Sequence, residues 1–161
     1  MWPHESLVDL AIKLLESAAA NPESMTNNEF EYTPGKPLVN LYKQKGRKED
    51  ARKVLLKAAA LKSYERYDPG YQTYQRIRNA MAFATEYRQL GYPADAIKVY
   101  QQVMSQPNDF VTAQRYYGRD MKQDVQKGLS EALKELKPES LPELLSPTTV
   151  ITITMDEKGK P

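Results

Sequence analysis

The chain has 161 residues, one histidine, no cysteine and a net charge of +2. The lack of cysteine excludes disulfide bonds and cysteine-based zinc sites, and a lone histidine leaves little for a histidine-based catalytic or metal centre. No apolar run reaches the roughly 20 residues of a membrane span, and no basic region precedes an apolar stretch at the N-terminus. We therefore expect no membrane partner and favour a cytoplasmic location, leaving open a signal encoded upstream.

Helices are predicted through most of the chain, because Ala, Leu, Glu, Lys, Gln and Arg are abundant and Gly is scarce. Several prolines fall between the apolar periodic segments, where a missing N–H costs least. In chain order, the predicted helices span residues 5–20, 36–45, 48–62, 71–90, 94–106, 109–126, 129–137 and 139–146.

The end of the chain has a different pattern. Residues 148–155 alternate Thr with apolar residues, and residues 156–159 are typical of a hairpin turn. Because an isolated strand or hairpin is marginal in water, we expect this β-prone segment to pair with a following domain or with another copy of the chain. The predicted domains are a helical domain, 1–146, and a C-terminal tail, 147–161, that begins a further segment of a larger protein.

One signature recurs along the predicted helices. It consists of Ala, a large apolar residue four positions later, and a small or apolar residue three positions after that. These offsets place all three on one helix face. The copies are Ala11, Leu15, Ala18; Ala51, Leu55, Ala58; Ala96, Tyr100, Val103; and a degenerate Ala132, Leu136.

A second pattern precedes two of these copies. Leu38, Val39, Tyr42 and Gly46 align with Phe83, Ala84, Tyr87 and Gly91. Glycine adopts positive φ without a Cβ clash, so each aligned Gly marks the end of one helix and the reversal of the chain. Each unit is therefore predicted to be a helix, a tight turn and a second helix.

These patterns resemble the tetratricopeptide repeat family. Residues 83–103 carry that family's spacing and residues 38–58 are a fair second match, while Gly118 lies at the family period of 34 after Ala84. The resemblance implies an all-α, right-handed α-solenoid of antiparallel helix pairs. The recurring Ala positions lie 40, 45 and 36 residues apart, so insertions near residues 25–37 and 64–74 make the array irregular.

The resemblance also implies a concave groove lined by the first helix of each unit. Most groove positions are basic, which suits carboxylates because Arg and Lys bind them well. We therefore expect a scaffold that binds an acidic or extended peptide of a partner protein, the alternative being ordinary solvated side chains. The implied groove residues are Lys36, Asn40, Lys43, Arg78, Met81, Thr85, Arg88, Thr112, Arg115, Arg119 and Lys122.

Other functions have less support from the residues. No phosphate-loop, Gly-x-Ser-x-Gly or His-Glu-x-x-His motif is present, so no enzyme activity, cofactor or metal is expected. Arg76, Arg78 and Arg88 near tyrosines could contact single-stranded nucleic acid, a disfavoured alternative. A spacer between flanking domains is the other alternative. The tyrosines of the longest insertion are expected to seal it onto neighbouring helices rather than to bind a partner; they are Tyr64, Tyr67, Tyr71 and Tyr74.

Overall fold

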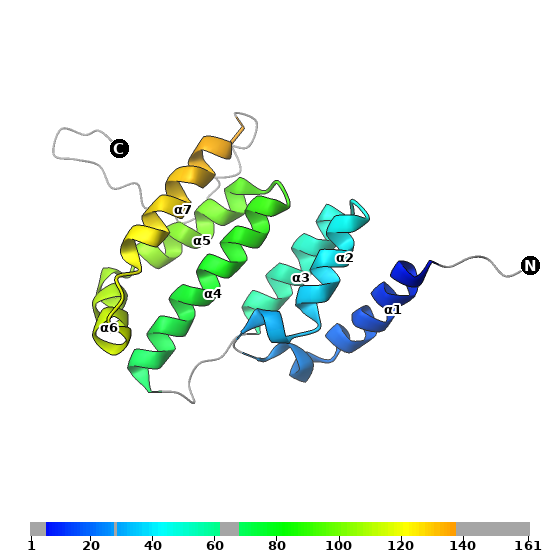
Figure 1. Ribbon diagram of the computed structural model, residues 1–161, viewed down its shortest axis with the longest axis horizontal. Helices are drawn as coiled ribbons and strands as arrows, with labels where there is room; N and C mark the ends of the chain where they lie inside the picture. Colours follow the sequence, from blue (N-terminus) through cyan, green and yellow to red (C-terminus); the bar gives the residue numbers. More distant parts are fainter. Residues whose placement is uncertain (1–5, 28, 62–67, 138–161) are drawn as a thin grey trace, which may run out of the picture. The chain divides into compact units, whose positions relative to one another are not determined.

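The computed structural model describes residues 6–27, 29–61 and 68–137 (Figure 1). Over these residues the protein is all-α, with seven α-helices and two short 3-10 helices. None of the described helices combines the length and the apolar character that a membrane crossing requires. The predicted helix 139–146, the tail 147–161, Tyr64 and Tyr67 lie outside the described residues.

The chain divides into two compact units, Met1–Tyr67 and Asp68–Pro161. In the first unit α1 packs on α2, and α2 packs on α3. The side chain of Ser6 caps the start of α1 by accepting a hydrogen bond from the Asp9 N–H at 3.1 Å. The elements of this unit are α1 (Leu7–Ala20), η1 (Pro22–Met25), η2 (Phe30–Tyr32), α2 (Gly35–Gln44) and α3 (Lys48–Ala60).

The insertion before α2 contributes to the core of the first unit. Met25 in η1 and Phe30 in η2 are buried. Gly35 allows them to lie close to the backbone of α2, because a Cβ there would sit 2.6 Å from Met25 Cε and 2.7 Å from Phe30 Cε2. The insertion therefore adds packed apolar side chains rather than a simple surface loop.

The predicted glycine turns are confirmed in both units. Gly46 and Gly91 have φ of 69° and 85°. The residue after each glycine donates its N–H to the carbonyl of the aligned tyrosine, from Arg47 to Tyr42 at 2.8 Å and from Tyr92 to Tyr87 at 2.9 Å. This hydrogen bond closes a helix C-terminus around a left-handed residue.

In the second unit α4 packs on both α5 and α6, and α5 packs on α7. The longest helix, α4, buries Ile77, Phe83, Ala84 and Tyr87, so it forms the centre of this unit. Asp68 caps α4 by accepting from the Tyr71 N–H at 3.2 Å. The elements are α4 (Pro69–Gln89), α5 (Pro93–Met104), α6 (Pro107–Tyr117) and α7 (Lys122–Glu135).

The prediction of a single helix over 109–126 is wrong. The helix α6 ends at Tyr117, because Gly118 has φ of 68° and caps it in the left-handed conformation. The side chain of Asp120 then accepts from the Lys122 N–H at 2.9 Å, and α7 begins there instead of at residue 129. The α6 helix packs on α4, whereas α7 packs mainly on α5 and less on α4, so α6 and α7 do not form the expected third pair.

Candidate binding surface

In the first unit, the structure places Lys36, Asn40 and Lys43 on one face of α2. Their spacing of four and three residues aligns them along the helix, and the buried Leu38 and Tyr42 fix α2 from its other side. Asn40 is exposed, and the two lysines are half-buried. The face therefore presents two ammonium groups with an amide between them.

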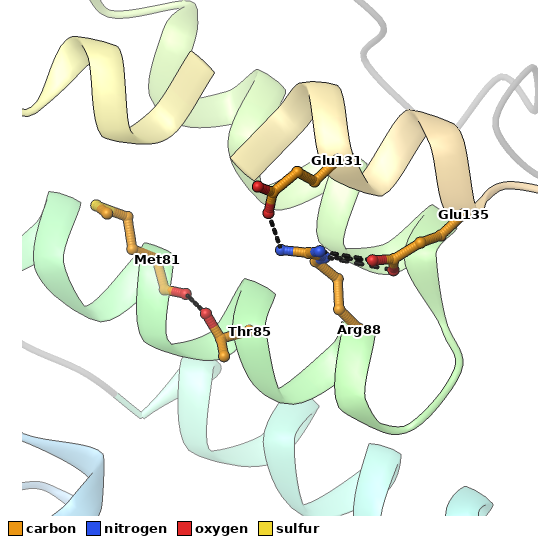
Figure 2. Close-up of polar contacts among 5 residues, drawn as sticks. All are labelled: Met81, Thr85, Arg88, Glu131 and Glu135. Carbon is orange, nitrogen blue, oxygen red and sulfur yellow. Dashed lines mark hydrogen bonds and ion pairs between the residues drawn. The ribbon is translucent and has the colours of Figure 1, made fainter. Parts of the chain in front are cut away.

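The aligned positions in the second unit are Met81, Thr85 and Arg88 of α4, each 45 residues later in the chain. Their exposure follows the same order as on α2: half-buried, exposed, half-buried. The Thr85 hydroxyl donates to the Met81 carbonyl at 3.0 Å (Figure 2). The two helices thus carry equivalent rows, but only one of the three aligned positions on α4, Arg88, is charged.

That charged member is already bound within the unit. Arg88 reaches from α4 to α7, where its Nη2 lies 2.5 Å from Glu135 Oε1 and its Nη1 lies 3.1 Å from Glu131 Oε2 (Figure 2). The hydrogen bonds to the Glu135 carboxylate raise the pKa of Arg88 above its usual range. This effect outweighs partial burial, which lowers the pKa. The charge of Arg88 therefore holds α7 against α4.

Two other predicted cations, Arg119 and Lys122, do not lie on a first helix. Arg119 lies in the turn after α6, and its Nη2 is 2.9 Å from Asp124 Oδ2. Lys122 is the first residue of α7. Their expected positions on the helix 109–126 are therefore incorrect, for the reason that Gly118 ends α6.

Arg78 and Arg115 lie on α4 and α6, two helices that pack together. Both side chains are exposed. The nearby Arg76 forms an ion pair with Asp109 of α6, with 3.6 Å between Nη2 and Oδ2. Arg78 lies three residues before Met81 and so extends the α4 row, whereas Arg115 lies on α6 and outside that row.

A cluster of tyrosines joins the start of α4 to the end of α6. The rings of Tyr74 and Tyr117 are stacked, with centroids 3.7 Å apart, and those of Tyr71 and Tyr116 meet edge-on at 6.3 Å. The Tyr116 hydroxyl donates to Asp68 at 3.0 Å, and this bond raises the pKa of Tyr116. Tyr71 and Tyr74 thus lie on α4 and pack against α6, while residues 62–67 of the insertion that they were expected to seal lie outside the described residues. Spacing along the chain gave no signal for their partners on α6.

A polar cluster in the first unit was also missed from the sequence. The Tyr42 hydroxyl donates to Glu16 of α1, while the Arg47 guanidinium lies 4.5 Å from the centre of the Tyr42 ring and binds Asp50 at 2.8 Å. Burial, and then the bond to Glu16, raise the pKa of Tyr42 well above its ordinary value. This cluster ties α1 to the α2–α3 turn.

Two shallow hollows flank this cluster. One, of about 330 Å³, is lined by acidic and basic side chains of α1 together with Arg47. The other, of about 180 Å³, lies among α1, η1, α2 and α3 and is mostly apolar. Among the described residues, no group of three or more acidic or histidine side chains could hold a metal ion.

No family model, curated protein or solved structure matches the chain.

Proposed function

We propose that the chain is a helical-repeat scaffold, with the tetratricopeptide-like solenoid architecture, that binds an acidic or extended peptide of a partner protein. The observation that carries this proposal is the pair of equivalent first-helix rows on α2 and α4. The two rows occupy aligned positions of the repeated helix pair. In both rows the first and third side chains are half-buried and the second is exposed. The α2 row supplies most of the charge, through Lys36 and Lys43.

The geometry of the α2 row fits an extended chain with regularly spaced carboxylates. Lys36 and Lys43 are seven residues apart, which corresponds to about 10 Å along a helix. In the polyproline II form of an extended peptide, which repeats every three residues, residues three apart lie on the same side and are separated by about 9 Å. The Asn40 amide lies between the lysines and can both donate to and accept from a peptide backbone. A peptide with acidic residues at every third position therefore matches the row.

Exposed ion pairs of this kind contribute only about 0.2–1 kcal/mol each. We therefore expect weak binding, on the order of micromolar or weaker, that decreases as the salt concentration rises. Two such contacts and one amide still distinguish an acidic peptide from a neutral one, because only the acidic peptide offers carboxylates to the two ammonium groups.

The test is a fluorescence polarisation titration with a labelled peptide that carries Asp at every third position on a Gly and Ser background. The double variant Lys36→Glu and Lys43→Glu should bind at least about tenfold more weakly than the wild type. The matched control, Lys53→Glu with Lys57→Glu, makes the same charge change on exposed positions of α3 and should bind as the wild type does. Equal losses in both variants would show that net charge, not the row, attracts the peptide.

A spacer is the second candidate function, and Arg88 favours it. Arg88, the cation among the three aligned positions of α4, is neutralised by Glu131 and Glu135, so this charge stabilises packing in the second unit. A spacer predicts no saturable affinity for the acidic peptide at low salt. The same titration therefore separates the two functions.

A further inference from the structure

The tyrosine cluster between α4 and α6 contains one pair of rings that lie face to face. The ring centroids of Tyr74 and Tyr117 are 3.7 Å apart, and the two planes are inclined by 19°. Aromatic pairs in proteins more often lie with centroids about 4.5–7 Å apart, offset or edge to face. The two phenol rings are therefore closer and more nearly parallel than is usual.

The other ring contacts of the cluster are longer and more inclined. The ring centroid of Tyr71 lies 6.2–6.4 Å from those of its three neighbours in the cluster, at interplanar angles of 39–61°. Tyr116 and Tyr117 follow one another in the chain, and their rings are 5.0 Å apart at 46°. Within this cluster, Tyr74 and Tyr117 are thus the pair whose ring faces meet.

Both rings are held by the helices that carry them. Tyr74 lies inside α4, and Tyr117 is the last residue of α6, where Gly118 ends the helix. The α6 helix packs on α4. The preceding Tyr116 donates its hydroxyl to Asp68, the N-cap of α4, at 3.0 Å. The end of α6 is therefore fixed against the start of α4, which keeps Tyr117 beside Tyr74.

The pair is accessible to a reagent in solution. Tyr117 is 42% exposed, and Tyr74 is half-buried. Exposure alone does not distinguish this pair, because Tyr32 of η2 is 69% exposed. The described residues place no other aromatic ring against Tyr32. Tyr74 and Tyr117 differ from it because an accessible phenol there meets a second phenol.

Two stacked phenols are arranged for coupling after one-electron oxidation. A tyrosyl radical carries unpaired spin on the ring carbons next to the hydroxyl-bearing carbon. A bond between two such carbons forms through π orbitals that stand perpendicular to the rings, so the rings must approach face to face. An edge-on pair, such as Tyr71 and Tyr116, directs these orbitals away from each other. The stack of Tyr74 on Tyr117 therefore has the geometry that the reaction needs.

We propose that one-electron oxidants join Tyr74 to Tyr117 by a carbon–carbon bond, a dityrosine, which fastens α6 to α4. Each phenol gives one electron to the oxidant and its hydroxyl proton to water. The two radicals then combine to form the bond between their ring carbons. The hydrogens on the bonded carbons move to the ring oxygens through water, which restores both phenols. The product has lost two hydrogen atoms, and the oxidant has gained the two electrons.

The test treats the full-length chain, at low micromolar concentration, with photoexcited ruthenium tris-bipyridyl and persulfate, which is an outer-sphere one-electron oxidant. We expect dityrosine fluorescence in the monomer band of a denaturing gel. Trypsin should release a fragment that joins residues 67–76 to residues 116–119, lighter by two hydrogen atoms than the sum of its parts. The melting temperature should rise by roughly 5–15 °C, because the bond closes a long loop of the unfolded chain.

Three tyrosine variants locate the bond. Tyr74→Phe and Tyr117→Phe each keep the ring but remove the phenol, so each should lose the linked fragment and the rise in melting temperature. The matched control, Tyr71→Phe, removes a phenol from the same helix and the same tryptic fragment, and it should retain both. Circular dichroism before oxidation should show the same helical content in all three variants.

Several results would overturn the proposal. They are a linked fragment whose bond maps to Tyr71, an undiminished yield in Tyr117→Phe, and dityrosine found in the dimer band alone, which would show coupling between separate molecules. Dityrosine that involves Tyr32 would show that exposure, not stacking, selects the site. An unchanged melting temperature of the cross-linked wild type would reject the fastening of α6 to α4.

Discussion

The guanidinium of Arg88 contacts both Glu131 and Glu135, so one side chain of α4 binds two carboxylates that lie a turn apart on α7. Its side chain is 22% exposed, and charge-assisted hydrogen bonds shielded from water are stronger than surface ones. This arrangement explains why α7 lies against the end of α4 although α5 is its main neighbour.

We expect Arg88→Met to destabilise the protein by about 1–3 kcal/mol, because it leaves two neighbouring carboxylates without their cation. Urea unfolding followed by circular dichroism measures the change. The control is Arg115→Met, whose side chain is exposed, and it should alter stability by less than about 0.5 kcal/mol. Equal stability of the two variants would contradict a packing role for Arg88.

Two glycines lie so close to tyrosine side chains that substitution by alanine should destabilise the protein. A Cβ at Gly128 would lie 2.5 Å from the ring of Tyr100, and a Cβ at Gly70 would lie 2.5 Å from the ring of Tyr116. Tyr100 is buried, and Tyr116 is held by its hydrogen bond to Asp68. We expect each substitution to cost about 1–3 kcal/mol. Thermal unfolding of both variants tests this, and an unchanged melting temperature for either variant would contradict the expected clash.

The hydrogen bond from Tyr42 to Glu16 predicts a loss of stability at alkaline pH. The folded protein raises the pKa of Tyr42 above the unfolded value of about 10. The contribution is therefore fully present below about pH 10 and is lost as pH rises through the folded pKa. Between pH 8 and pH 11, the free energy of unfolding should fall more in the wild type than in Tyr42→Phe. Parallel decreases in urea titrations would show that Tyr42 is not responsible.

The fold was predictable where local chemistry decides it. Gly46 and Gly91 each follow a buried tyrosine by four residues, and both adopt the positive φ that ends a helix. The recurring Ala positions identified the faces of α3 and α5 that pack, because Ala51 and Ala96 are fully buried. Periodicity and glycine turns were therefore sufficient for these two helix pairs.

The rest depended on contacts between residues far apart in the chain. By its spacing, Gly118 matched the small residue inside the first helix of a unit. It instead caps the end of α6. The sequence pattern does not distinguish a glycine inside a helix from one in a left-handed cap. The role of Arg88 depends on Glu131 and Glu135, which lie on another helix. The helix positions of the candidate residues were therefore predicted correctly on α2, where all three residues of the row share one helix. They were predicted incorrectly for Arg119 and Lys122, which lie between α6 and the start of α7.

The row of Lys36, Asn40 and Lys43 is the surface that we propose binds an acidic extended peptide. The most direct measurement is an NMR titration of isotope-labelled protein with the Asp-containing peptide at low salt. We expect the largest shifts in the backbone amides of residues 35–44 and in the Asn40 side-chain amide, with a weaker response as salt is added. Shifts confined to other helices, or no shifts at millimolar peptide, would contradict the claim.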